Sequence, residues 1–340
     1  MISVVQLGRL DYVAGLRLQQ KLVGLRKAGQ VGDVLLLLEH TPVITLGRNA
    51  KAANVLASRE LLAARGVEVY ECDRGGDVTF HGPGQLVGYP IFDLRGYSHQ
   101  PSAVSHQFAG DRSRVSGDRS QVSGLGSQEQ PAAAKGVTPP SPRKTLGAVD
   151  YVRRLEEVLI RTCADFGIPT KRVAGLTGVW TEAQGPSTRA EALARDEAQG
   201  PSTRASSLRS VALPRDDREE RVAAEVGREA KIAAIGVHIS RSVTSHGFAL
   251  NVNTDLSFFD LIVPCGIAAK PVTSIERELG REVELAAVAE SVSRNFGAVF
   301  GRQMLWVETV DALLGNVVGV PVKAPAELRE IRGEDETSWA

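Results

Sequence analysis

Apolar runs and alternating positions in the first hundred residues predict a mixture of strands and helices. Residues 2–6 read as a strand, and the unbroken apolar run 34–38 is typical of a central strand buried on both faces. Asp11 stands before apolar residues at helical spacing, which predicts a capped helix. Residues 43–46 continue as a strand, and residues 58–65 form a short predicted helix.

The second half of the chain repeats this mixture. Residues 150–166 place their apolar side chains on one helical face, and Asp150 is the expected N-cap of that helix. Residues 231–239 and 247–252 read as strands, and residues 285–299 as a last amphipathic helix.

Two stretches, about 98–147 and about 183–229, hold few large apolar side chains and are rich in small and polar residues. Each also contains an internal repeat. Such segments cannot bury enough surface to offset the entropy lost on ordering. We expect them to be surface insertions in a single domain that covers residues 1–310. Residues 311–340 then form a C-terminal extension with a charged tail.

Composition narrows the classes of function. The 340-residue chain is 43% hydrophobic and carries 40 basic and 40 acidic residues. This balance argues against a nucleic-acid partner held through phosphate contacts. No apolar run approaches the roughly 18 residues of a membrane span, and the N-terminus does not read as a secretory signal. Three widely spaced cysteines form neither a disulfide framework nor a zinc site, which fits a reducing cytoplasm.

Residues 74–85 combine four glycines with Arg74 and His81. Glycine accommodates positive φ and lets a ligand approach the backbone, and consecutive N–H groups can surround an anionic or carbonyl oxygen. Arg74 adds a fixed positive charge, and His81 is expected to titrate near neutrality. The simpler alternative is a glycine-rich hairpin without a ligand, but the combination favours a binding site.

The three cysteines differ in their settings. Cys163 lies on the apolar face of a predicted helix and is expected in the core. Cys72 ends a strand beside the glycine-rich stretch, and its role stays open. Cys265 stands between a proline and a glycine after an apolar run, a setting that suits a nucleophile, although a buried turn cysteine is an alternative.

Lys231 opens a predicted strand and, taken alone, reads as a solvated lysine at the edge of a sheet. Its functional alternative is a partner for Cys265, because an adjacent ammonium lowers a thiol pKa from its usual value of about 8.5. The histidines at 81, 238 and 246 are each expected to be structural when taken singly. His246, in a predicted turn, is the best functional candidate beside His81, and none has metal-ligand spacing.

Several motifs, taken in order, closely resemble the lipoyl(octanoyl) transferases, the octanoyl-carrier-protein:protein N-octanoyltransferases of lipoate biosynthesis. The matching segments are 38–48, 74–91, 178–180, 231–236, 246–251 and 264–267. The resemblance spans residues about 2–310 in the family's order. The two low-complexity stretches depart from it, at places where the family usually has short connections.

This resemblance implies an α+β fold, a mixed sheet flanked by helices like the catalytic module of biotin and lipoate ligases. It implies Cys265 as the nucleophile that carries an acyl thioester, and Lys231 as the residue that lowers the pKa of that thiol. It also implies an acyl-binding tunnel. The tunnel residues would be Arg74, Gly75, Gly76, Asp77, Val78, Thr79, Phe80, His81, Ala234, Ile235, Gly236, Gly247, Phe248 and Ala249.

The implied donor is octanoyl-acyl-carrier protein. The implied acceptors are lipoyl domains of 2-oxoacid dehydrogenase complexes and the glycine cleavage H protein. A thioester is already activated, so no ATP, other cofactor or metal is expected. The acceptor lysine amine, with a pKa of about 10.4, must lose a proton, and Lys231 is the expected base. Backbone N–H groups near Gly266 would hold the oxyanion. Four apolar residues are expected to gauge the acyl chain: Val78, Phe80, Ile235 and Phe248.

Three alternatives stay open. An ATP-dependent lipoate or biotin ligase has the same fold, but lipoate ligases usually have a third glycine where Asp77 stands and need no cysteine such as Cys265. An octanoyl amidotransferase, which moves the chain between carrier domains, also uses a cysteine. From another class, the protein would be an inactive binder of acyl chains or lipoyl domains, which acylation of Cys265 by the carrier would exclude.

Overall fold

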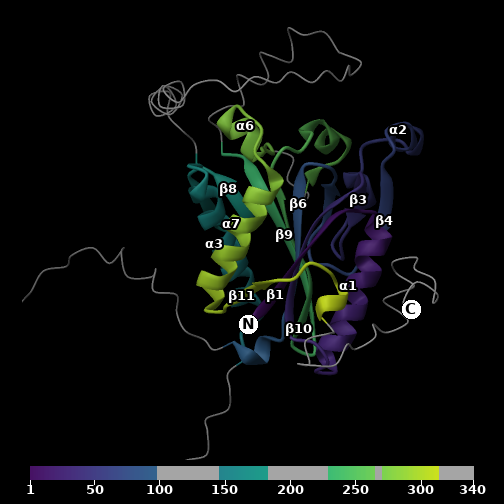
Figure 1. The fold of residues 1–340 in the computed structure, drawn as a ribbon. Coiled ribbons are helices and arrows are strands. Elements are labelled where there is room, and N and C mark those ends of the chain that lie inside the picture. Colours follow the sequence, from purple (N-terminus) through teal and green to yellow (C-terminus); the bar gives the residue numbers. More distant parts are fainter. Residues whose placement is uncertain (98–144, 183–228, 265–269, 314–340) are drawn as a thin grey trace, which may run out of the picture.

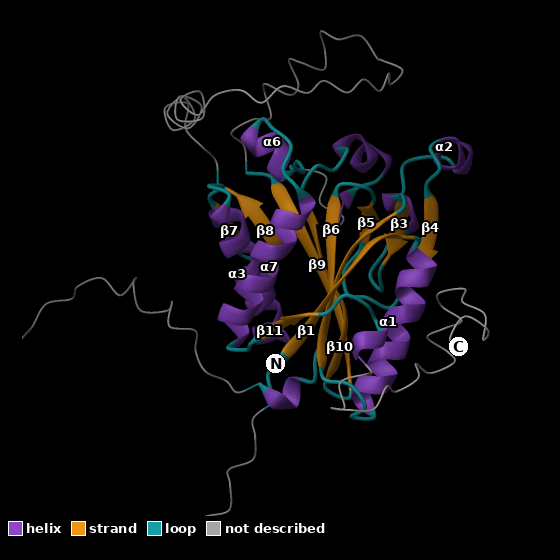
Figure 2. Cartoon of the chain, in the orientation of Figure 1, coloured by secondary structure: helices purple, strands orange, loops and turns teal. Residues whose placement is uncertain are grey.

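The computed structural model describes residues 1–97, 145–182, 229–264 and 270–313. Within these residues, an eight-stranded mixed sheet and a three-stranded sheet are accompanied by helices (Figures 1 and 2), as the α+β prediction requires. The larger sheet has the order β11 (Met304–Trp306), β1 (Ile2–Leu10), β2 (Asp33–His40), β6 (Gln85–Ile91), β10 (Val243–Asn251), β9 (Lys231–Ser240), β8 (Leu176–Thr181), β7 (Thr170–Val173).

The predicted central strand lies where its apolar run requires. All residues from 34 to 38 are buried within β2, which pairs in parallel with β1 and antiparallel with β6. From β6 to β7 the neighbouring strands are all antiparallel. The strand expected at residues 2–6 is longer and reaches Leu10.

Helices cover both faces of the larger sheet. Two long helices, α3 (Ala148–Asp165) and α7 (Leu285–Phe300), pack on one face and share its main core. The opposite face carries α1 (Tyr12–Lys27). The small sheet lies past the N-terminal end of this helix (Figure 2). The small sheet has the order β4 (Glu68–Glu71), β3 (Val43–Leu46), β5 (Val78–His81). The remaining helices are η1 (Ala52–Asn54), α2 (Arg59–Ala64), η2 (Leu94–Gly96), η4 (Leu256–Leu261), α6 (Ile275–Leu279) and η6 (Asp311–Leu313).

Two predicted helix starts have different outcomes. Asp11 caps α1, because its carboxylate accepts a hydrogen bond from the Ala14 N–H at 2.8 Å. The prediction that Asp150 caps α3 is wrong: the N-cap is Gly147, and Asp150 lies in the first turn. A carboxylate in the first turn favours the helix through its dipole without being the cap, so the residue type was informative and the position was not.

The glycine-rich stretch is not a hairpin. The strands before and after its first half, β4 and β5, lie on opposite sides of β3, the first parallel and the second antiparallel to it. Gly82 to Gly84 then carry the chain from β5 in the small sheet to β6 in the large one. The stretch therefore joins the two sheets, which places it between them.

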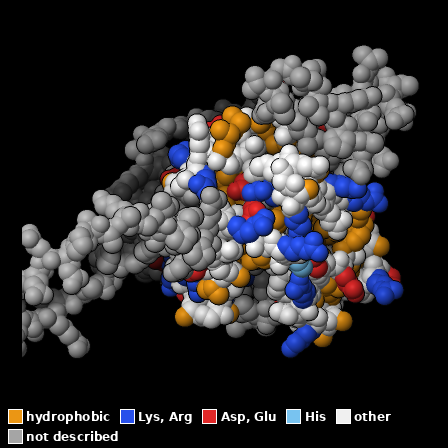
Figure 3. Space-filling model, turned by 90° about the horizontal axis from the view of Figure 1, so that it is seen from below, with side chains coloured by type: hydrophobic (Ala, Val, Ile, Leu, Met, Phe, Trp, Pro, Cys, Tyr) orange, Lys and Arg blue, Asp and Glu red, His pale blue; other side chains and the backbone are white. Residues whose placement is uncertain are grey.

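The end of the molecule shown in Figure 3 carries several Lys and Arg side chains. Among the ion pairs of the described chain, Arg26, in the last turn of α1, bonds Asp33 at 2.7 Å, and Arg95 bonds Asp93 at 2.6 Å. Among the helices in the described part of the chain, none combines the length and the apolar character needed to cross a membrane.

The predicted insertions at about 98–147 and 183–229 fall almost entirely outside the described residues. The same holds for the predicted C-terminal extension beyond η6. The assignment of a single domain with two insertions therefore stays a prediction.

Candidate active site

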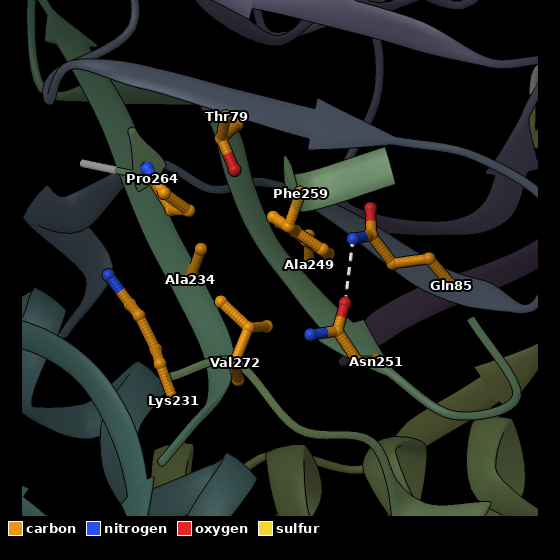
Figure 4. A pocket seen from close by; sticks show the side chains of 10 residues that line it. Thr79, Gln85, Lys231, Ala234, Ala249, Asn251, Phe259, Pro264 and Val272 are labelled. Atoms are coloured by element: carbon orange, nitrogen blue, oxygen red, sulfur yellow. Dashed lines mark hydrogen bonds between the residues drawn. The ribbon is translucent and has the colours of Figure 1, made fainter. Parts of the chain in front are cut away.

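A pocket lies where β9 and β10 face β5 and η4 (Figure 4). Its floor includes Ala234 and Ala249, which are directly paired across the two antiparallel strands. Two methyl side chains at a paired position leave space that larger residues would fill. The complete lining is Thr79, Gln85, Lys231, Ala233, Ala234, Ala249, Asn251, Phe259, Pro264 and Val272.

Lys231 forms one end of this pocket. It is the first residue of β9, as predicted, but its side chain is only 8% exposed, so it is not a solvated edge lysine. Its N–H donates to the Pro271 carbonyl at 2.8 Å and its carbonyl accepts from the Thr273 N–H at 3.0 Å. The Lys231 Nζ lies 5.3 Å from the centre of the Trp180 ring, a cation–π arrangement. The Lys231 side chain is thus held in the pocket wall.

The chain directly behind Lys231 is shaped to admit its side chain. Gly178 has φ +123°, and a Cβ placed there would lie 2.8 Å from Lys231 Cε and 2.6 Å from the Ala233 carbonyl oxygen. Only glycine fits both the backbone conformation and this space. The Gly178 N–H donates to the fully buried carboxylate of Glu156 at 3.3 Å. Arg153 and Arg172 pair with that carboxylate at 2.7 and 3.1 Å.

The other end of the pocket is closed by a pair of amide side chains (Figure 4). The Gln85 amide donates to Asn251 Oδ1 at 2.8 Å, and Asn251 donates to the Thr273 carbonyl at 2.9 Å. Gln85 also donates to the Phe80 carbonyl at 3.2 Å and accepts from His81 Nδ1 at 2.8 Å. Both amides are buried with partners on each side, so this end is a rigid structural wall.

The guanidinium of Arg74 is occupied by its own surroundings. It donates to the Thr45 carbonyl and to the Asp77 carbonyl, both at 2.7 Å, and to the Thr45 hydroxyl at 2.9 Å. The next residue, Gly75, donates its N–H to the Val237 carbonyl of β9 at 3.0 Å. Arg74 therefore shapes the glycine-rich loop and fastens it beside β9, and substrate contact by this side chain stays a prediction.

The expectation that His81 titrates near neutrality is wrong. Burial, together with the nearby His40 and Arg74, lowers the pKa of His81 to about 3. Burial likewise lowers the pKa of His40, whose Nε2 accepts from the Tyr89 hydroxyl at 2.6 Å, to about 4. Both rings are therefore neutral near pH 7 and serve as hydrogen-bonding groups. The turn chemistry around His81 gave no sign of this burial.

His238 and His246 both contact Asp73, just before the glycine-rich loop. His246 Nε2 lies 2.6 Å and His238 Nδ1 3.0 Å from the Asp73 carboxylate oxygens. The prediction that His246 occupies a turn is wrong, because it lies inside β10, with φ +55° and a backbone N–H that donates to Gln19. Burial lowers the pKa of His246 against the opposing effect of Asp73. This cluster ties the loop to β9 and β10.

The structure brings Lys231, Thr79, Ala234 and Ala249 together around one pocket. The four residues expected to gauge the acyl chain are placed elsewhere. Ile235 and Phe248, next to the paired alanines, point into the core under α3 and α7, and Val78 and Phe80 pack in the core of the small sheet. Successive side chains of a strand face opposite sides of the sheet, so the pocket is lined by their neighbours Thr79, Ala234 and Ala249, and the role of the four residues as a chain gauge stays a prediction.

The remaining predicted tunnel residues are backbone positions. Gly76 lies in the loop with φ +96°, and Gly236 passes close under the Gly75 carbonyl, where a Cβ would lie 2.6 Å from that oxygen. Gly247 lies in β10, directly paired with Gly236. The carboxylate of Asp77 accepts a hydrogen bond from the side chain of Asn54. Their contact with an acyl chain stays a prediction.

Cys265 lies outside the described residues. The preceding residue, Pro264, lines the pocket at the same end as Lys231 (Figure 4). Cys163 is fully buried, as predicted, and burial raises the pKa of its thiol to about 12. The thiol of Cys72 donates to the Leu46 carbonyl at 3.4 Å.

Sequence reasoning did not single out Gln85, Asn251, Phe259 or Val272 as pocket residues. The alternation of β6 and β10 indicates which face Gln85 and Asn251 occupy. Phe259 lies on the short helix η4 and Val272 lies outside the named strands, so no periodicity locates them. In the part of the chain that the structure describes, no group of three or more His, Cys, Asp or Glu side chains is arranged to hold a metal ion.

The arrangement of the two sheets, with Lys231 in a pocket between them, is that of the catalytic module of lipoate ligases. The fold is similar to that of a bipartite lipoate protein ligase from Thermoplasma acidophilum, studied with its E2 lipoyl domain. The TM-score is 0.52 at 11% identity, covering 92% of this chain and 89% of that one. At this identity the likeness shows the fold alone. The lipoyl protein ligase A/B catalytic domain matches residues 11–109 and 137–297.

Relatives found by sequence have a much higher identity to this chain than that structure. The chain is 45% identical to an octanoyltransferase of Koribacter versatilis over 98% of both chains. It is 46% identical to one of Acidobacterium capsulatum over 92% of this chain and 96% of that one. The protein belongs to the octanoyltransferase family and is an acyltransferase.

Proposed function

We propose that this protein transfers an octanoyl group from the thioester of an acyl carrier protein to a lysine of a lipoyl domain, through an acyl thioester on Cys265. The observation that carries the proposal is the shared end of the pocket: Pro264, which precedes Cys265, and the Lys231 side chain both line it. Apolar side chains of Ala234, Ala249 and Val272 line the pocket beside Lys231 and suit an aliphatic chain.

In the first step the Cys265 thiolate attacks the thioester carbonyl of the donor. A new sulfur–carbon bond forms, and the bond to the carrier breaks, so that the carrier leaves as a thiolate. One thioester replaces another, and the step is close to thermoneutral. The positive charge of Lys231 favours the thiolate form of Cys265, because an adjacent ammonium lowers a thiol pKa. Backbone N–H groups near Gly266 would stabilise the oxyanion.

In the second step the amine of the acceptor lysine attacks the acyl thioester. The nitrogen–carbon bond forms, the bond to Cys265 breaks, and the amine nitrogen must lose a proton. Lys231 becomes neutral when it gives its proton to the carrier thiolate that leaves in the first step, and it then accepts the proton of the attacking amine. The acceptors are lipoyl domains of 2-oxoacid dehydrogenase complexes and the glycine cleavage H protein. The thioester supplies the free energy, so the reaction needs no nucleotide.

Intact-mass measurement after mixing the protein with octanoyl-carrier protein tests the covalent intermediate. We expect a mass increase of one octanoyl group that is absent from Cys265→Ser and present in Cys72→Ser, the matched control. An octanoylated lipoyl domain, offered as the donor in a parallel sample, should acylate the protein far more slowly. If the wild-type protein stays unmodified by the carrier, the proposed function is wrong.

Lys231→Arg separates the two roles assigned to Lys231. Arginine keeps the positive charge but does not deprotonate in the useful pH range, so acyl-enzyme formation should stay within about tenfold of wild type. Discharge onto the lipoyl domain should fall by about 10² or more, the usual scale for losing a general base. The acyl-enzyme should then accumulate and be visible by mass. Normal turnover by this variant would exclude the base role.

A further inference from the structure

Asp77, in the glycine-rich loop, directs its carboxylate away from the pocket and toward the nearby segment that contains Lys51 and Asn54. Its Oδ2 accepts from the Asn54 side-chain amide at 2.6 Å. Its Oδ1 accepts from the backbone N–H of Val78 at 2.8 Å and of Lys51 at 3.2 Å. The carboxylate thus joins the start of β5 to the turn that contains η1.

The turn that contains η1 is hydrogen-bonded to residues 261–263, which precede residue 265. The Asn54 carbonyl accepts from the Val263 N–H at 2.7 Å, and Val55 and Ile262 form an isolated antiparallel bridge. Leu56 and Ala57 donate their N–H groups to the Leu261 carbonyl at 2.9 and 3.1 Å. Residues 54–57 and 261–263 therefore run side by side, fixed at one end by Asp77.

We infer that Asp77 is a positioning residue for the nucleophile. The path has two links: the carboxylate of Asp77 holds Asn54, and the backbone of Asn54 holds Val263, two residues before Cys265. Pro264 lines the pocket between them. The Asp77 carbonyl also accepts from Arg74 at 2.7 Å, so the loop that carries the carboxylate is itself fixed. The inference rests on the proposed role of Cys265 as the nucleophile.

The first test is Asn54→Asp. The carboxylate of Asp77 keeps its contacts with Val78 and Lys51, but it now meets a second carboxylate at position 54, and two acceptors face each other. Misplacement of a reacting group by about 1 Å can cost about 10²-fold in rate. We expect kcat and the iodoacetamide alkylation rate of Cys265 to fall about tenfold or more, with KM for octanoyl-carrier protein unchanged. Alkylation of Cys72 in the same sample is the internal reference.

The second test exchanges the two side chains. In Asn54→Asp/Asp77→Asn, the amide at 77 donates to the carboxylate at 54, and the contacts with Val78 and Lys51 stay in place. This double variant should recover both rates. Asp77→Asn alone should stay close to wild type, because the Asn54 amide can turn over and accept from the new amide. If Asn54→Asp fails to fold, recovery of folded protein with both wild-type rates in the double variant still supports the anchor.

Asp93→Asn, which removes a buried carboxylate at the far end of β6, is the control for the aspartate substitution in the double variant. It should leave both rates unchanged. Wild-type rates in Asn54→Asp overturn the inference. So does a loss that the second substitution fails to recover, because the effect would then not depend on the pair of side chains at 54 and 77. Alkylation needs no acyl donor, so these outcomes are distinct from failure of the proposed transfer reaction.

Discussion

The two ends of the pocket are built in different ways. At one end, Gln85 and Asn251 have their amide groups bonded to each other and to three further partners. At the other end, Lys231 lies in a space made by Gly178, against the face of Trp180. One end is held by directional bonds, and the other by shape and charge.

This difference separates a structural role from a chemical one. A fully paired amide network keeps one arrangement, because any movement leaves a buried polar group unpaired. A lysine amine that must exchange protons needs room and a flexible side chain, which glycine behind it provides. A change at the first end should therefore act mainly on stability, and a change at the second mainly on rate.

The largest expected effect is that of Gly178→Ala. The substitution strains a backbone at φ +123° and places a methyl group 2.8 Å from Lys231 Cε. Such strain costs about 1–3 kcal/mol, and displacement of the base should reduce kcat by about 10² or more. Steady-state kinetics together with a urea unfolding curve separates the two effects.

Gly175→Ala is the control for Gly178→Ala. Gly175 also has positive φ, +79°, but no atom lies within 4 Å of a Cβ placed there, and it stands in the turn before β8. The control should show a stability loss of similar kind with kcat unchanged. If Gly178→Ala keeps the wild-type kcat, the shape of this end does not position Lys231.

The opposite pattern is expected from Gln85→Leu. It leaves His81 Nδ1, the Phe80 carbonyl and Asn251 Oδ1 without the partner that each has now. Unpaired buried groups cost about 1–3 kcal/mol each, and partial relaxation makes about 3 kcal/mol a reasonable total. Denaturant unfolding should show this loss, while the alkylation rate of Cys265 stays at the wild-type value. Gln20→Leu, on the exposed side of α1, should change neither.

Much of this arrangement was predictable from the sequence, because it depends on local pattern. The buried run of β2, the cap at Asp11 and the opening of β9 at Lys231 all follow from periodicity and residue type. The family resemblance brought Lys231, Thr79, Ala234 and Ala249 to one site, and the pocket confirms that they lie together.

The parts that failed depend on three-dimensional context. Whether Ala234 or Ile235 faces the pocket is decided by which side of the sheet carries the small sheet, and the alternation of a strand is the same in both cases. His81 looked titratable because its neighbours are turn residues, yet it is buried in the folded chain. Two partners of Asp77, Lys51 and Asn54, lie more than twenty residues away, and no spacing rule connects them.

The buried histidines beside the amide end give the third prediction, which concerns pH. In the folded protein the pKa of His81 is about 3 and that of His40 about 4, whereas an unfolded histidine titrates near about 6.5. The unfolded chain therefore binds more protons between these values, and the folded state loses stability as pH falls through this window. The stability is fully present above about pH 6.5.

From pH 7 to pH 5, each of the two histidines should reduce the free energy of unfolding by about 2 kcal/mol. His246, whose pKa is also lowered, acts in the same direction, whereas carboxylates with lowered pKa, such as Asp93, act only in more acidic solution. Urea unfolding at several pH values measures the slope. His40→Gln, which cannot titrate, should have a shallower slope by one histidine's share, whatever its absolute stability. An unchanged slope would show that the pKa of His40 is nearly the same in the folded and the unfolded protein, and that the wall beside Gln85 is less dry than its burial indicates.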